Sequence, residues 1–217
     1  MNTEFPFLEN PFDEILNKND AKEINKKCED IAKTLFEQYC LKCNDKEYYF
    51  AEIEFYYYDS EMYLKNENKF KWQEVTYPRN DYKGGQLFYH LSGIDICFDS
   101  QYNTDRGKFG GILIRAIKDE NGLIIAGPLK CKDEILNECK NGKMPKLLHK
   151  NKKRDIELKQ TYRSLGKTGT DKENDRLCFF DSSIGICDWN PEKDRFVTKN
   201  GTIESKKGTY DTSKFKV

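Results

Sequence analysis

The sequence predicts an α+β fold, in which one domain is built on a mixed, mainly antiparallel, curved sheet with surrounding helices. An amphipathic helical pattern near the start is followed by several short strand-like segments. These elements are interspersed without the regular alternation of βαβ units, which favours antiparallel pairing over a parallel sheet. A chain of 217 residues is long enough to bury a core and fits a single domain.

The first 43 residues predict an arm and a helix. Residues 1–20 contain two prolines and are expected to form an extended arm, whose three phenylalanines would hold it against the body. Residues 21–43 carry apolar side chains at helical spacing with charges between them, which predicts an amphipathic helix.

Residues 48–57 predict a half-buried strand, because apolar and polar side chains alternate. Its two faces would be Ala51, Ile53 and Phe55 against Glu52, Glu54 and Tyr56. A solvated face explains the glutamates, since most exposed glutamates are only exposed. The alternative is a site in which a carboxylate acts as acid or base beside an aromatic platform.

The remaining elements follow from local patterns. Residues 59–85 read as a long polar loop with a short helix inside, and a long loop in a compact domain is often functional. The other expected elements are two short strands over 86–100, a strand over 111–117, a strand, Gly-Pro break and helix over 123–142, irregular basic chain over 143–175, a strand pair over 176–187 and a hairpin over 195–205. An Arg inside the apolar strand, Arg115, either snorkels or has a buried partner or a ligand.

Three divisions of the chain are expected. They are an arm over 1–20, a domain over 21–185 and a hairpin extension over 186–217 that packs on the domain.

Composition limits the partners and the location. Lys+Arg and Asp+Glu both number 37, so net charge gives no argument for a polyanionic partner, although the stretch 143–154 is strongly basic. The acidic N-terminus lacks an apolar signal region, and no run approaches about 18 apolar residues, so neither secretion nor a membrane partner is expected. Eight cysteines then predict reduced thiols in a cytoplasmic protein. Cys40 and Cys43 stand alone at metal spacing with only two histidines in the chain, so neither a metal nor another cofactor is expected.

Five stretches, in order along the chain, resemble the alkyladenine (3-methyladenine) DNA glycosylase family. They are IEFY (53–56), YPRN (77–80), GQLFYHLSGIDICFD (85–99), GILIRAI (111–117) and GPLK (127–130). The resemblance is distant and covers about residues 48–182. It implies a methylpurine-DNA-glycosylase-like fold and a monomeric enzyme that flips a damaged purine out of duplex DNA and hydrolyses its N-glycosidic bond.

The resemblance also implies roles for single residues. Glu54 matches the carboxylate that activates the attacking water. Arg115 matches the arginine near that water, where it would pair with Glu54 or with a substrate phosphate, and a neighbouring cation favours an ionised carboxylate. Tyr56 and His90 would stack on the flipped base, and a structural role is the alternative for His90. Asp99 stands where the family has an Asn that contacts the base.

Four further residues are expected to bind DNA. Arg79 and Asn80 are either phosphate contacts beside the pocket or turn residues. Lys146 and Lys150 lie in the basic stretch, which is either a solvated face or a phosphate-binding surface that positions the protein without reading sequence.

The chain departs from the family pattern where the protein would grip DNA and read the base. Ser92 occupies the place of a bulky wedge tyrosine, in a segment one residue shorter, and Tyr57, Tyr58 or Tyr82 would have to replace it. Asp99 changes the hydrogen bonding to the base, the loop 59–77 lacks the family's pocket histidine, and the chain is neutral. A drifted scaffold therefore stays open, acting on another N-glycoside or binding nucleic acid or protein without catalysis. A third possibility is a protein-interaction surface formed by the arm and the C-terminal hairpin.

Overall fold

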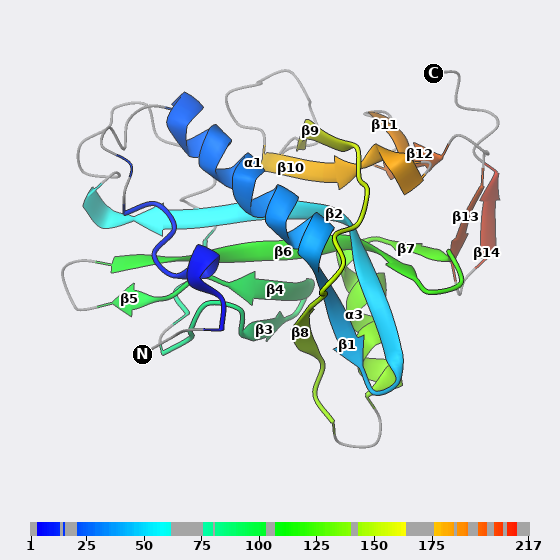
Figure 1. Ribbon diagram of the computed structural model, residues 1–217, viewed down its shortest axis with the longest axis horizontal. Coiled ribbons are helices and arrows are strands. Elements are labelled where there is room, and N and C mark those ends of the chain that lie inside the picture. Colours follow the sequence, from blue (N-terminus) through cyan, green and yellow to red (C-terminus); the bar gives the residue numbers. More distant parts are fainter. Residues whose placement is uncertain are drawn as a thin grey trace.

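A curled antiparallel sheet with two helices forms the described part of the chain, which confirms the α+β class in a single domain (Figure 1). The computed structural model describes residues 4–13, 15, 21–61, 76–79, 81–102, 107–139, 143–163, 176–184, 186–190, 195–198, 202–205 and 208–211. The helices are α1 (Ala21–Gln38) and α3 (Pro128–Glu138), with 3-10 turns η1 (Pro6–Leu8) and η4 (Ser182–Ile184). Neither α1 nor α3 is long and apolar enough to cross a membrane.

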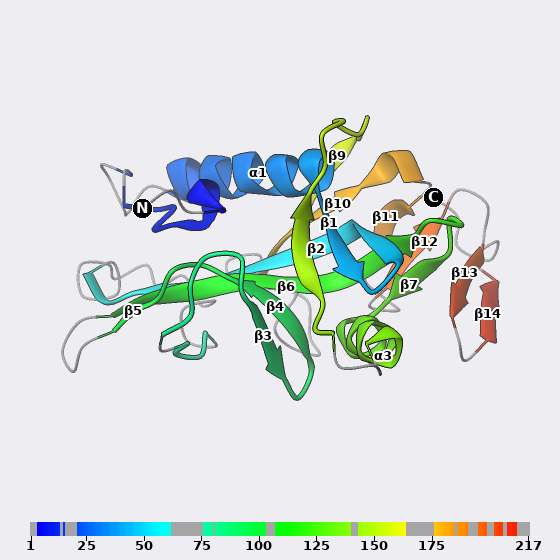
Figure 2. The same ribbon diagram turned by 60° about the horizontal axis from the view of Figure 1, so that its bottom comes forward.

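The main sheet has ten strands. They are β1 (Tyr39–Cys43), β2 (Lys46–Asp59), β3 (Leu87–His90), β4 (Gly93–Cys97), β5 (Gln101–Tyr102), β6 (Gly107–Asp119), β7 (Ile124–Ala126), β8 (Lys146–His149), β9 (Leu158–Arg163) and β10 (Arg176–Asp181). Its central path runs β3-β4-β6-β2-β1-β8, and β10 joins β2 to β9. Every pairing is antiparallel. Helices α1 and α3 lie on opposite sides of this sheet (Figure 2).

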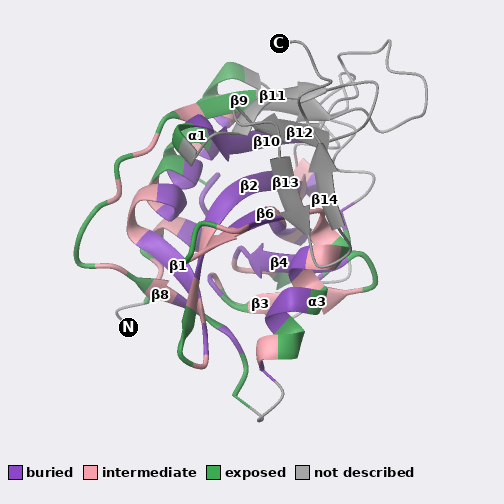
Figure 3. Ribbon diagram, turned by 90° about the vertical axis from the view of Figure 1, so that its right-hand side faces the viewer, coloured by how far each residue is buried: buried purple, intermediate pink, exposed green. Residues whose placement is uncertain are grey.

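The long strands β2 and β6 form the centre of the molecule, and Figure 3 shows them coloured mostly as buried. A β-bulge interrupts their pairing, because Glu52 pairs with Ala116, one residue out of the register that Phe50–Ile117 and Ile53–Ile114 share. The bulge shifts the alternation by one residue. Ile53 and Phe55 therefore enter the main core as predicted, whereas Ala51 lies in a separate small cluster. The predicted grouping of Ala51 with the other two was wrong.

Helix α1 is shorter than the pattern predicts. It ends at Gln38, and the expected last turn, Tyr39–Cys43, is strand β1 instead. β1 pairs with β2 on one side and with β8 on the other, so the sheet satisfies backbone groups that a helix would otherwise pair internally. The buried face of helix α1 packs on the sheet through Ile24, Cys28, Ile31, Leu35 and Phe36.

The N-terminal arm is part of the core, as its phenylalanines predict. Phe12 is buried, and its ring centroid lies 4.2 Å from that of Tyr57 and 5.6 Å from that of Phe98. Phe5 and Phe7 both pack against Tyr39.

The C-terminal pairings differ from those expected. β10 pairs with β2 and β9 rather than with β11 (Ile186–Asn190). β11 pairs with β12 (Arg195–Thr198), and β13 (Thr202–Ser205) pairs with β14 (Gly208–Asp211), so 195–205 is not the predicted hairpin. The basic region 143–175, expected to be irregular, contains β8 and β9, because each finds an open strand edge to pair with. Most of the loop predicted over 59–85 and the turn at 199–201 lie outside the described residues.

Candidate functional site

One row across the sheet brings together residues from five strands. The paired positions are Phe88 with Asp95, Asp95 with Leu113, Leu113 with Glu54, and Glu54 with Cys178. Directly opposed residues of antiparallel strands project from the same face. We call this surface the Glu54 face, and its central side chains are Glu52, Glu54, Tyr56, His90, Asp95, Leu113 and Arg115.

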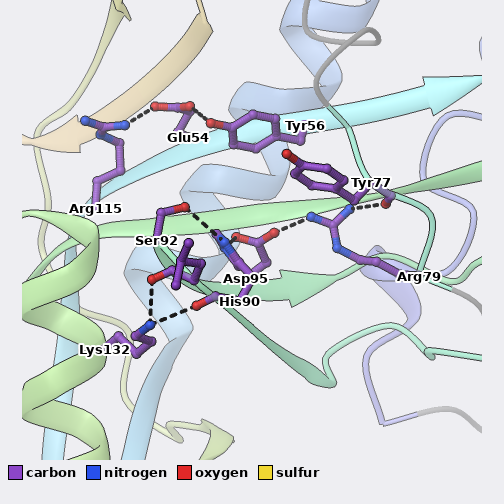
Figure 4. Close-up of polar contacts among 10 residues, drawn as sticks. Glu54, Tyr56, Tyr77, Arg79, His90, Ser92, Asp95, Arg115 and Lys132 are labelled. Carbon is purple, nitrogen blue, oxygen red and sulfur yellow. Dashed lines mark hydrogen bonds and ion pairs between the residues drawn. The ribbon is translucent and has the colours of Figure 1, made fainter.

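Glu54 is fully buried and holds three donors on its carboxylate. Tyr56 Oη donates to Oε1, and Arg115 Nη1 donates to Oε2 (Figure 4). Cys178 Sγ lies 3.6 Å from Oε2 and also donates. A buried carboxylate requires such partners, and their number fixes its orientation.

Arg115 bridges two carboxylates. Its Nε lies 3.2 Å from Glu52 Oε1 and forms an ion pair with it. The Arg115 Nε–H is not directed at that oxygen, so this contact is not a hydrogen bond. Burial opposes the charge on Arg115, but the carboxylates of Glu54 and then Glu52 outweigh it and raise the pKa of the guanidinium. With both glutamates ionised, the three side chains carry one surplus negative charge in a buried environment.

A second polar group lies on the same face, on strands β3 and β4. Asp95 Oδ2 accepts from Arg79 Nη2, and Asp95 Oδ1 lies 3.1 Å from His90 Nε2. The other ring nitrogen of His90, Nδ1, lies 3.1 Å from Ser92 Oγ. The result is a continuous chain from a buried guanidinium through a carboxylate and an imidazole to a hydroxyl at the surface (Figure 4).

Arg79 is therefore buried, whereas a residue that binds DNA phosphate would lie at the surface. It is 3% exposed, its guanidinium lies 5.2 Å from the centre of the Phe88 ring, and Nη1 donates to the carbonyl of Tyr77. Burial raises the pKa of the neighbouring Cys97 thiol to about 12, with Arg79 opposing the shift. Asn80 lies outside the described residues.

The β3–β4 turn presents an apolar side chain that the motif analysis missed. His90 pairs with Gly93, so Leu91 and Ser92 form the turn. Leu91 is 93% exposed, and Lys132 Nζ of α3 donates to the carbonyls of His90 at 2.9 Å and Leu91 at 2.7 Å. The available signal was an apolar residue in a two-residue turn, where polar residues are usual.

A side chain at Gly93 would crowd its neighbours and force the Leu113 side chain to shift. A Cβ there would lie 2.6 Å from Leu113 Cδ1 and 3.1 Å from Pro128 Cβ, with His90 Nε2 3.6 Å away. The imidazole, Leu113 and the start of α3 thus converge over one backbone position, which explains why glycine follows the turn.

Three predicted site residues lie away from Glu54. Asp99 Oδ1 accepts from Gly84 N, and Asp99 and Lys146 line a pocket of about 910 Å³ beside the N-terminal arm. Lys150 Nζ lies 2.6 Å from Glu47 Oε2 in an ion pair. The sheet therefore brings together Glu54, Tyr56 and Arg115, and in a second group His90 and Ser92. Asp99, Lys146 and Lys150 belong to neither group.

The tyrosines proposed to replace the wedge are also placed. Tyr57 is buried between Phe12 and Phe98, and Tyr58 stacks on Phe109 at 4.7 Å between ring centroids. Tyr82 packs edge-on against Phe88 and lines the pocket beside the arm. By contrast Tyr77, in the same turn as Arg79, is 68% exposed.

Within the described residues, no group of three or more Cys, His, Asp or Glu is arranged to hold a metal ion. Cys40 and Cys43 are buried free thiols whose pKa values burial raises, that of Cys40 to about 12. Comparison of the chain with family models, with curated proteins and with solved structures gave no match.

Proposed function

We propose that this protein is a DNA N-glycosylase that hydrolyses the N-glycosidic bond of a damaged purine, with Glu54 activating water. The observation that carries the proposal is a fully buried glutamate fixed by Arg115 and Tyr56, in a group with Glu52 and Arg115 that holds one surplus negative charge. The likeness of five ordered stretches to the alkyladenine glycosylases supports the same chemistry and a glycosylase-like topology.

The charge arrangement suits bond cleavage at a sugar. Loss of a base from deoxyribose develops positive charge at C1′ and the ring oxygen, and fixed negative charge stabilises that state. Water then forms the new C1′–O bond as Glu54 takes its proton. Arg115 orients the carboxylate in this scheme without cancelling both glutamates.

Duplex DNA would supply the substrate by base flipping, whose unstacking cost is offset by side chains that fill the gap. Leu91 supports this step because it is apolar, exposed at a turn tip and held through its backbone by Lys132. Tyr56 and Tyr77 offer aromatic rings for the flipped base on the same side of the sheet (Figure 4).

A second candidate is hydrolysis of a smaller N-glycoside, such as a nucleoside. It is favoured because two cations expected to contact phosphate are engaged within the protein. Arg79 is buried against Asp95, and Lys150 is paired with Glu47. Phosphate contacts supply most of the affinity of DNA-binding proteins.

The test separates the two candidates by substrate form. Purified protein is incubated with hypoxanthine in duplex DNA, in a single strand and as free inosine, and released base is measured by chromatography. Faster release from the duplex than from the other two substrates supports the glycosylase, provided that this release is lost in Glu54→Gln and kept in the exposed-turn control Glu120→Gln. Preference for inosine supports the second candidate, and no release from any substrate contradicts both.

A further inference from the structure

We propose that the opening between strands β3 and β8 binds an extended, basic segment of a partner protein, which adds to the sheet as a further strand. The two strands are the ends of the central path of the sheet (Figure 1). Both contribute residues to the pocket of about 910 Å³ beside the N-terminal arm, whose lining includes neither Glu54 nor Arg115. The inference is therefore independent of the N-glycosidic reaction.

The outer edge of β3 offers backbone groups that no described strand uses. Cys97 N donates to the carbonyl of Gln86, so these two residues form a hydrogen-bonded pair at the start of the β3–β4 ladder. Hydrogen-bonded pairs recur at every second position of an antiparallel ladder. Leu87 and Tyr89 therefore lie between such pairs, and their N–H and C=O groups point away from β4. Both residues line the pocket.

The outer edge of β8 is open in the same way. Lys150 N donates to the carbonyl of Gln38, which continues the register of β8 with β1. The same alternation leaves the N–H and C=O groups of Leu147 and His149 pointing away from β1. Among the described residues no strand pairs with either outer edge, and Leu147 lines the same pocket. An extended peptide binds such a free edge by exchanging main-chain hydrogen bonds with it.

Apolar side chains form much of the pocket between the two edges. Leu147 is part of the main core, and Leu87 and Tyr89 pack against it. Met144, which is 63% exposed, also lines the pocket. Alternate side chains of a strand point to the same face of a sheet, so every second residue of an added strand enters this pocket. Its volume lies within the range of about 300–1,000 Å³ typical of ligand sites, which leaves room for more than one side chain.

The charges around the pocket favour a basic partner. Four carboxylates and two lysines line it, which leaves two negative charges; they are Glu4, Glu9, Asp81 and Asp99 against Lys83 and Lys146. No described cation pairs with Glu4, Glu9 or Asp81. Lys or Arg residues beside the apolar residues of the peptide meet these carboxylates, whereas an acidic segment is repelled.

The experiment selects binders of the full chain from a display library of random peptides about ten residues long, and fluorescence anisotropy then measures their affinities. We expect the recovered sequences to carry Lys or Arg together with apolar residues at every second position. Replacing alternate peptide amides with esters removes N–H donors without adding bulk. Each backbone hydrogen bond contributes roughly 2- to 12-fold, so two replacements in the set that faces an edge should weaken binding by about fivefold or more.

A double variant tests the charged rim without touching the core. Glu9→Gln combined with Asp81→Asn removes two negative charges, and Asn tolerates the positive φ of 65° at Asp81. Exposed ion pairs strengthen binding by about 1.4- to 5-fold each, so the double variant should bind the peptides about 2- to 30-fold more weakly. Glu120→Gln combined with Asp133→Asn removes two exposed carboxylates that do not line the pocket, and this matched control should bind normally.

Three results would overturn the inference: no enrichment of any peptide, affinity that survives ester replacement in both alternate sets, or affinity that the rim variant leaves unchanged. Sedimentation of the free chain as a dimer that the peptides do not dissociate would also overturn it, because a second copy would then occupy the open edges in place of a basic partner.

Discussion

Replacing Glu54 with Gln is the most informative change at the Glu54 face. The side chain keeps its size, but one carboxylate oxygen becomes an amide NH₂ group. Tyr56 Oη and Arg115 Nη1 donate to different oxygens, so the NH₂ group must face one of these donors. With the NH₂ group toward Tyr56, whose hydroxyl can turn and accept from it, Arg115 keeps an oxygen acceptor but its hydrogen bond loses the carboxylate charge.

The cost in stability follows from the weakened hydrogen bond to Arg115. Hydrogen bonds to charged groups contribute about 1.5–3 kcal/mol, so the free energy of unfolding should fall by about that amount. For a chain of this size each kcal/mol lowers Tm by about 2–4 °C. The variant should therefore remain folded at 25 °C. Loss of the Glu54 general base should slow single-turnover release of the purine by about 10²-fold or more.

Glu52→Gln is the matched control, because it removes the same charge from the same guanidinium. It should lower stability but keep a carboxylate at position 54, so release should be at least about tenfold faster than in Glu54→Gln. Thermal unfolding and chromatographic detection of free base measure the two effects. Equal inactivity of both variants would refute the assignment of Glu54 as the base, and so would normal release by Glu54→Gln.

Three further changes test other parts of the molecule. Leu91→Ala should weaken binding to lesion-containing duplex without lowering Tm, whereas Leu91→Phe should preserve it; unchanged affinity in a fluorescence anisotropy titration would exclude a role for the turn tip. Phe12→Ala should lower the free energy of unfolding by about 3–5 kcal/mol in urea denaturation, because the ring is buried against Tyr57, and a loss near zero would mean that the arm is not part of the core. The hydrogen bond from Lys150 lowers the pKa of Glu47, so its contribution is present above the unfolded pKa and is lost as pH falls through the folded pKa. Lys150→Met should cost up to about 1 kcal/mol at pH 7, and the cost should vanish only when the pH is below the lowered folded pKa of Glu47; a difference that persists in stronger acid would point to another cause.

Local patterns predicted the parts of the fold that they determine. The alternation along β2 and the apolar run of β6 predicted two strands, and the resemblance implied that Glu54 and Arg115 lie near the same attacking water. The structure pairs the two directly. The bulge near Ala51 could not be predicted, since it depends on the register between β2 and β6 rather than on either sequence.

Long-range pairing explains the other differences. Tyr39–Cys43 continues the helical pattern, but two neighbouring strands draw it into the sheet. The sequence carries no signal for Asp95, because a single Asp in a short strand has no local partner. Its role emerges only when β4 places it between His90 and Arg79, which come from a different strand and a turn.

The most direct test of the central claim is release of free hypoxanthine from duplex DNA by the wild-type protein, with Glu54→Gln as the paired control. We expect one equivalent of free base per lesion, at least about 10²-fold faster with the wild type than with the variant. Absence of free base, or equal release by the two proteins, would contradict the assignment of Glu54 as a water-activating base.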